Sequence, residues 1–133
     1  AFERRYFKRP KSNFMKKDPK TFLLHILESI KLIEDFTKGC STEKFFESDI
    51  IQNATIRMIE IIGEAVKNIP KDFKLKHPEV PWKNIAGTRD KLIHEYFGVD
   101  LKLTYRIIKE NIPELKQKIS KILKEIDKKN KLI

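Results

Sequence analysis

The sequence predicts an all-α protein, most simply an up-and-down bundle of four to five helices. Apolar residues recur at spacings of three and four over most of the chain, and no stretch of useful length alternates like a strand. Glycines and prolines stand mainly where helices should begin or end. The 133 residues, 40% hydrophobic and 36% charged, allow one domain with a core and exclude a disordered chain.

The first helix is expected to begin at Pro19, behind the cap Asp18, and to end before Gly39. A short helical turn is expected over residues 41–47. The apolar stripe of the first helix consists of Phe22, Leu23, Ile26, Leu27, Ile30, Ile33 and Phe36.

A long helix is expected next, from the cap Ser48 to about Ile69, where Pro70 stops it. Its apolar surface is wide, which implies burial on more than one side, in a bundle interior or a subunit interface. Residues 70–80 are polar and bounded by prolines, so we expect a connector there.

Residues 81–97 are expected to form one continuous helix, ended by Gly98. Asp100 caps the next helix, over residues 101–111. Pro113 then starts the last helix, whose apolar residues share one face.

The charge balance favours a polyanionic partner. The chain has 29 basic and 19 acidic residues, a net charge of +10, and such an excess suits RNA, DNA, an acidic protein or an anionic membrane surface. Residues 1–14 carry +4 of it and read as an upstream extension or a cloning remnant, because a well-patterned helical domain, residues 15–133, begins at Met15.

Several classes of protein are excluded. Cys40 is the only cysteine, so there is no disulfide framework and no thiolate zinc site. No window approaches the roughly 18 apolar residues of a transmembrane helix, so we expect no membrane partner. No secretory signal is recognisable, and we expect a cytoplasmic protein without cofactor or metal, since the three histidines are far apart.

The segment from Thr88 to Asp100 carries the chemistry, because it brings Arg89, His94 and Tyr96 together. Histidine can act as a general base near neutral pH, and arginine can hold a phosphate and stabilise developing negative charge. RNA supplies its own nucleophile, the 2′-OH, so its cleavage does not require a metal. The segment therefore suits phosphodiester cleavage.

Spacing raises a difficulty for this interpretation. On one ideal helix Arg89 and His94 point about 140° apart, with about 7.5 Å of rise between them. They can act together only if the helix end is distorted or a second copy contributes. A structural interpretation stays open, with His94 as a helix-terminal histidine and Tyr96 as a core aromatic.

Residues 89–96, RDKLIHEY, carry the pattern Arg, four residues, His, one residue, Tyr. With this pattern the chain resembles the HepT-like toxins of the HEPN superfamily, small all-helical proteins. The resemblance extends over nearly all of residues 77–100. It also includes residues 49–70, which contain a Gly63-Glu64 pair. In total it covers about residues 16–123.

The resemblance implies a HEPN-like homodimeric ribonuclease toxin. In it Arg89 and His94 of both copies would line one cleft, and RNA would be cleaved without metal, leaving a cyclic phosphate. Asp90 would orient the arginine or a partner histidine. The implied partner is an MntA-like nucleotidyltransferase antitoxin, which would control the toxin by adding AMP to Tyr96.

Two rival functions remain. The chain could be a dimer that binds a nucleotide or RNA without cutting it, or a structural partner of a nucleotidyltransferase. On the long helix, Glu64 is either a carboxylate near the cleft or a solvated, salt-bridged residue, and Arg57 on the same face is a possible intersubunit partner.

Overall fold

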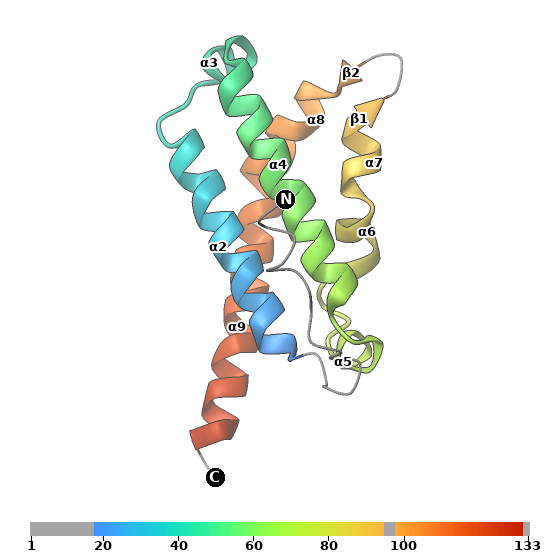
Figure 1. Ribbon diagram of the computed structural model, residues 1–133. Coiled ribbons are helices and arrows are strands. Elements are labelled where there is room, and N and C mark those ends of the chain that lie inside the picture. Colours follow the sequence, from blue (N-terminus) through green and yellow to red (C-terminus); the bar gives the residue numbers. More distant parts are fainter. Residues whose placement is uncertain (1–17, 95–97, 132–133) are drawn as a thin grey trace, which may run out of the picture.

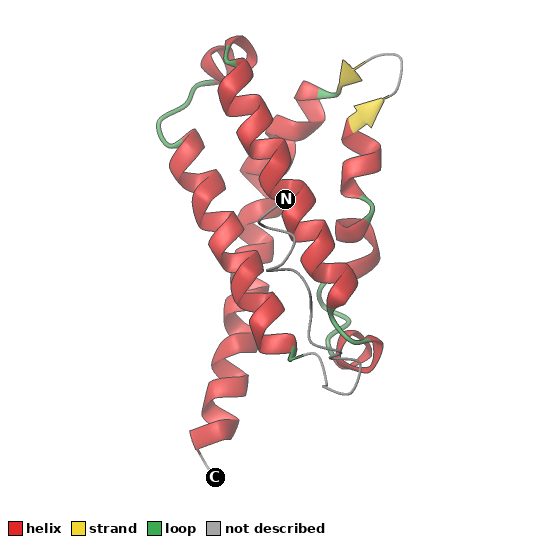
Figure 2. Ribbon diagram, viewed as in Figure 1, coloured by secondary structure: helices red, strands yellow, loops and turns green. Residues whose placement is uncertain are grey.

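The computed structural model describes residues 18–94 and 98–131 of the chain (Figure 1). The expected boundary at Met15 and the segment before it lie outside this part. Within it the chain runs up, down, up and down along one bundle, in the predicted topology (Figure 1). The described sheet is a two-stranded hairpin at the end far from the C-terminus (Figure 2).

The first two legs of the bundle begin where the sequence predicts. Helix α2 (Pro19–Thr37) starts at Asp18, whose carboxylate accepts the Lys20 backbone N–H at 3.0 Å. After the short helix α3 (Thr42–Glu47), helix α4 (Asp49–Asn68) starts at Ser48, whose hydroxyl accepts the Ile51 N–H at 3.2 Å. The turn between α2 and α3 uses Gly39 at φ +68°, a conformation that suits glycine.

The core lies where α2 packs against α4 and against α9 (Ile112–Lys131). It is built from the apolar stripes read from the sequence, and its least exposed members include Leu23, Ile26, Ile30, Ile33, Phe45, Val66, Leu92, Ile119 and Ile122. No helix in the described part of the chain combines the length and the hydropathy needed to cross a membrane.

The connector predicted over residues 70–80 holds a short helix, α5 (Lys71–Lys76), before the chain turns into α6 (Trp82–Ala86). Trp82 is buried, and its indole Nε1–H donates to the carbonyl of His77 at 2.9 Å. The start of α6 is therefore fixed against the loop that precedes it.

The single helix predicted over residues 81–97 is wrong. The chain forms α6, a break at Gly87, helix α7 (Thr88–Leu92) and strand β1 (Ile93–His94). Strand β1 pairs antiparallel with β2 (Gly98–Val99). In a continuing helix the Leu92 carbonyl would accept the N–H four residues later; here it accepts the Asp100 N–H at 2.8 Å instead.

The break predicted before Pro113 is absent. Helix α8 (Leu101–Arg106) passes through a π-helical turn, η2 (Ile107–Asn111), into α9 with helical backbone angles at both junctions. The Ile112 N–H donates five residues back, to the carbonyl of Ile107. The wider turn accommodates Pro113, which has no N–H and whose ring clashes with an ordinary α-turn.

Candidate active site at the contact of α4 and α7

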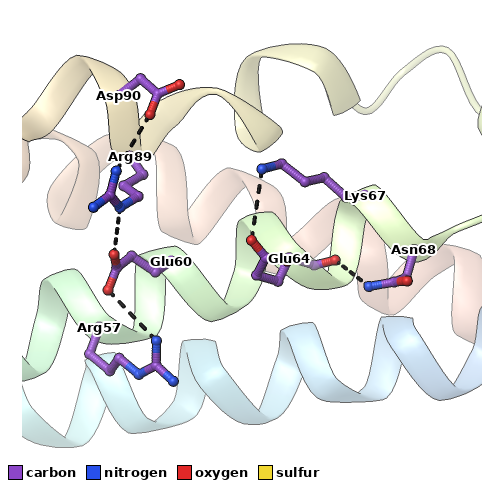
Figure 3. Close-up of polar contacts among 7 residues, drawn as sticks. All are labelled: Arg57, Glu60, Glu64, Lys67, Asn68, Arg89 and Asp90. Carbon is purple, nitrogen blue, oxygen red and sulfur yellow. Dashed lines mark hydrogen bonds and ion pairs between the residues drawn. The ribbon is translucent and has the colours of Figure 1, made fainter. Parts of the chain in front are cut away.

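The candidate site is organised by an ion pair between two helices. Arg89 stands in the first turn of α7, and its Nε–H donates to Oε2 of Glu60 on α4 at 2.6 Å (Figure 3). Because one partner is a guanidinium and the other a carboxylate, the hydrogen bond is charge-assisted. It fixes the direction in which Arg89 leaves its helix.

Two more charged residues extend this pair into a row. Arg57 Nη1 lies 3.8 Å from the second oxygen of Glu60, and Arg89 Nη1 lies 3.6 Å from Asp90 Oδ1 (Figure 3). Glu60 is the least exposed member, with 25% of its side chain accessible. The more exposed Arg57 and Asp90 flank the central contact, which Glu60 and Arg89 make.

Glu60 also acts on the charge of Arg89. The hydrogen bond and the attraction of the carboxylate raise the pKa of Arg89 above its ordinary value. Slightly over half of the Arg89 side chain, 53%, is nevertheless exposed. A guanidinium has five N–H groups in a planar fork, so Arg89 can contact an anionic ligand while Glu60 holds its Nε.

Gly63 marks the contact between α4 and the end of α6. It is buried, and a Cβ atom placed on it would lie 3.5 Å from the Ile85 carbonyl and 3.6 Å from the Ala86 carbonyl. The end of α6 thus packs directly on the backbone of α4. Glu60 lies one turn before Gly63, where α7 begins, which places its carboxylate within reach of Arg89.

The predicted site residues have different outcomes. Arg89 and Asp90 lie together at the surface, with Arg89 Nη1 3.6 Å from Asp90 Oδ1. The backbone of His94 pairs with Gly98 in the hairpin, so the angle of an ideal helix no longer relates His94 to Arg89. The side chain of His94 and all of Tyr96 lie outside the described part of the chain.

The sequence did not indicate Glu60, and it left two roles open for Glu64, a carboxylate near the cleft or a solvated, salt-bridged residue. Glu64 forms an exposed pair with Lys67, at 3.7 Å, so its alternative role as a salt-bridged surface residue is the observed one (Figure 3). Arg57 contacts Glu60 in its own chain. A glutamate one turn before the only glycine of a long helix was the available signal.

The described residues include no group of three or more histidine, cysteine, aspartate or glutamate side chains placed to hold a metal ion. The row at Arg89 contains two guanidinium groups, of Arg57 and Arg89, and two carboxylates, of Glu60 and Asp90.

Known proteins were compared with this chain. A family profile described as Ribonuclease HepT-like matches residues 26–122. "Probable ribonuclease HepT" of Thermococcus cleftensis is 52% identical over 110 residues, which cover 83% of this chain and 100% of that protein. No solved structure gives a significant match.

Two further relatives differ in length. "Gamma-glutamylcyclotransferase and putative RNase" of Methanocaldococcus jannaschii is 54% identical over 86% of this chain, which spans only 51% of that protein. "Putative RNase" of Caldanaerobacter subterraneus subsp. tengcongensis is 48% identical over 82% of this chain and 97% of its own length. All three names include ribonuclease activity.

Proposed function

The chain belongs to the HepT-like ribonuclease family, and on that premise we propose that it is a toxin that cleaves RNA internally without a metal ion. The observation that carries the proposal is Arg89: an exposed guanidinium, held by Glu60 at the start of α7, within the segment that resembles the catalytic motif of the family. Such a group suits a phosphodiester whose charge increases during reaction.

The proposed reaction is an attack by the RNA on itself. The 2′-oxygen forms a bond to the adjacent phosphorus as its proton passes to a general base, His94. The bond from phosphorus to the 5′-oxygen then breaks, and that oxygen takes a proton from a general acid. The products are a 2′,3′-cyclic phosphate and a 5′-hydroxyl. Arg89 stabilises the pentacoordinate phosphate, and Asp90 restricts the motion of the guanidinium.

We infer further that the working unit is a homodimer, in which the second copy supplies the general acid. Support comes from the outer face of α4. Ile50, Ala54 and Ile61 point within about 40° of one another on α4. Ile50 is 81% exposed, and Ala54 and Ile61 are half-buried. Arg57 shares this direction, so an apolar stripe adjoins the row of charges at Arg89.

Control by a nucleotidyltransferase antitoxin completes the proposal and rests on the family resemblance. AMP added to Tyr96 would place a phosphate and a bulky group two residues from His94. The added negative charge would compete with RNA for nearby cations and would obstruct the site. The matching experiment incubates the protein with such an enzyme and ATP, and uses mass spectrometry to locate the modified residue.

A cleavage assay with end analysis tests the function. The purified protein in a chelator should produce RNA fragments with cyclic phosphate ends, and His94→Ala should not. His25→Ala is the matched control, because His25 is exposed on α2, far along the chain from the hairpin. RNA binding without new ends in the unmodified protein would favour the non-catalytic alternative, and equal cleavage by His94→Ala would refute the assignment of the base.

A further inference from the structure

A pocket of about 270 Å³ lies on another side of α7 from the ion pair with Glu60, among α4, α6, α8, η2 and α9. Its floor is apolar and consists of Ile59, Ile62, Ile85, Leu103, Ile107, Ile112 and Leu115. The volume is ample for one planar aromatic ring system. Burial of such a ring would remove apolar surface from water on both partners.

The mouth of the pocket is polar. Asn84 on α6 and Asn111 on η2 both line the pocket, and both residues are exposed. Lys118 also lines the mouth, but Glu114 holds it in an ion pair at 2.8 Å. Lys91 makes no ion pair with any described residue, so it leaves one uncompensated positive charge at the opening.

The pocket and the candidate catalytic arginine share a helix. Thr88 and Lys91 line the pocket and stand on either side of Arg89 in the sequence. The Thr88 hydroxyl donates to the Asn84 carbonyl at 2.7 Å, which ties the start of α7 to the wall formed by α6. A helix with its side chains is only about 10–12 Å across. One strand of RNA can therefore reach Arg89 with a phosphate and the pocket with a nearby base.

The π-helical turn forms one wall. Ile107, Asn111 and Ile112 all line the pocket, and the bond from the Ile112 N–H to the Ile107 carbonyl widens the helix there. Such turns often mark functional sites because they move side chains out of the regular helical positions. The helix is therefore widened at the wall of the pocket.

We propose that this pocket binds an adenine base of the RNA substrate, next to the cleaved phosphodiester. The proposal rests on the proposed ribonuclease function and adds a preference to it. The apolar floor would cover the faces of the base, the amides of Asn84 and Asn111 would bond its edge, and Lys91 would contact the backbone phosphate. A purine buries more apolar surface in this volume than a pyrimidine does, which favours adenine over cytosine or uracil.

Direct binding of adenosine monophosphate, measured by calorimetry at low salt, is the first test. The protein should bind it saturably, and more tightly than cytidine monophosphate or inorganic phosphate. The change Asn111→Trp covers the mouth from an exposed position and should weaken binding by about tenfold or more. Asn130→Ala, an equally exposed asparagine on α9 outside the pocket, should leave it unchanged.

Two results would overturn the pocket: no saturable binding of adenosine monophosphate, or the same affinity in Asn111→Trp as in the unmodified protein. His94→Ala separates this inference from the function. It should bind the nucleotide normally, because every described residue that lines the pocket is unchanged in this variant.

Sequencing of cleaved RNA ends is the second test. The unmodified protein should cut beside adenine, and the double variant Asn84→Ala, Asn111→Ala should lose most of that preference while it still cuts. Cleavage with no preference in the unmodified protein would refute the inference and leave the ribonuclease function intact. A protein that binds adenosine monophosphate and cuts no RNA would refute the function and the role of the pocket in substrate choice.

Discussion

The Nε of Arg89 lies 2.6 Å from a carboxylate oxygen of Glu60, although 29 residues separate them in the sequence. This contact joins the second leg of the bundle to the short helix that carries the candidate site. It makes Glu60 a positioning residue: it contacts the arginine, while the arginine is the group that would contact RNA.

The change Glu60→Gln should slow cleavage by about tenfold, because the guanidinium of Arg89 would no longer be held in the orientation that the reaction needs. The amide oxygen can still accept a hydrogen bond, but the charge that holds the guanidinium is gone. Exposed ion pairs contribute under about 1 kcal/mol, so the melting temperature should hardly move. The loss should fall on kcat more than on KM.

Glu64→Gln is the matched control for that experiment, since Glu64 is exposed on the same helix and pairs only with Lys67 among the contacts described above. It should cleave at the normal rate. Equal rates for both variants would show that Glu60 does not position Arg89.

A small and a large side chain substituted for Gly63 should have opposite effects on stability. A Cβ there would meet the Ile85 and Ala86 carbonyls at ordinary contact distances, 3.5 and 3.6 Å. Gly63→Ala should therefore be tolerated and should stabilise α4 by up to about 1 kcal/mol through helix propensity. Gly63→Leu should push α6 and α7 away, lower the melting temperature and reduce cleavage. Destabilisation by alanine as severe as by leucine would contradict this packing.

Mixed dimers test whether the site is shared between two copies. Arg89→Ala and His94→Ala should each be inactive alone. When the two are unfolded and refolded together, cleavage should recover about tenfold or more above either one, because a mixed dimer still holds one arginine and one histidine. The control mixes Arg89→Ala with the double variant, where recovery is impossible. Absence of recovery in the test mixture would show that one arginine and one histidine from different copies are not enough for cleavage.

Two helix caps give a further comparison. Asp100 caps α8 by accepting the Leu103 N–H at 3.0 Å, as Asp18 caps α2. Replacement of either by alanine should cost about 1 kcal/mol in the free energy of unfolding, measured with denaturant. Only Asp100→Ala should also reduce cleavage, because it borders the hairpin that carries His94. A similar loss with Asp18→Ala would indicate a general effect of stability.

Local signals in the sequence predicted most of the fold. Asp18, Ser48 and Asp100 each cap the helix that the sequence assigned to them, because a cap depends on residues within one turn. The up-and-down order follows from the apolar stripes between those caps. The family assignment was confirmed as well.

Features set by distant contacts were not predictable in this way. The end of α7 depends on a hydrogen bond from the Asp100 N–H to the Leu92 carbonyl, and no residue pattern near Leu92 predicts this bond. Pro113 is typical of a helix start, and only the structure shows that a π-turn absorbs it. The choice of Glu60 over Glu64 depends on how α6 and α7 pack along α4, where the end of α6 lies on Gly63.

The bond between the Asp100 N–H and the Leu92 carbonyl has one more consequence. It joins the two ends of the hairpin, so the end of α7 and the start of α8 are held together on either side of residues 94–98. A segment grafted here from a relative should therefore replace residues 94–98 and leave the helices on both sides in place.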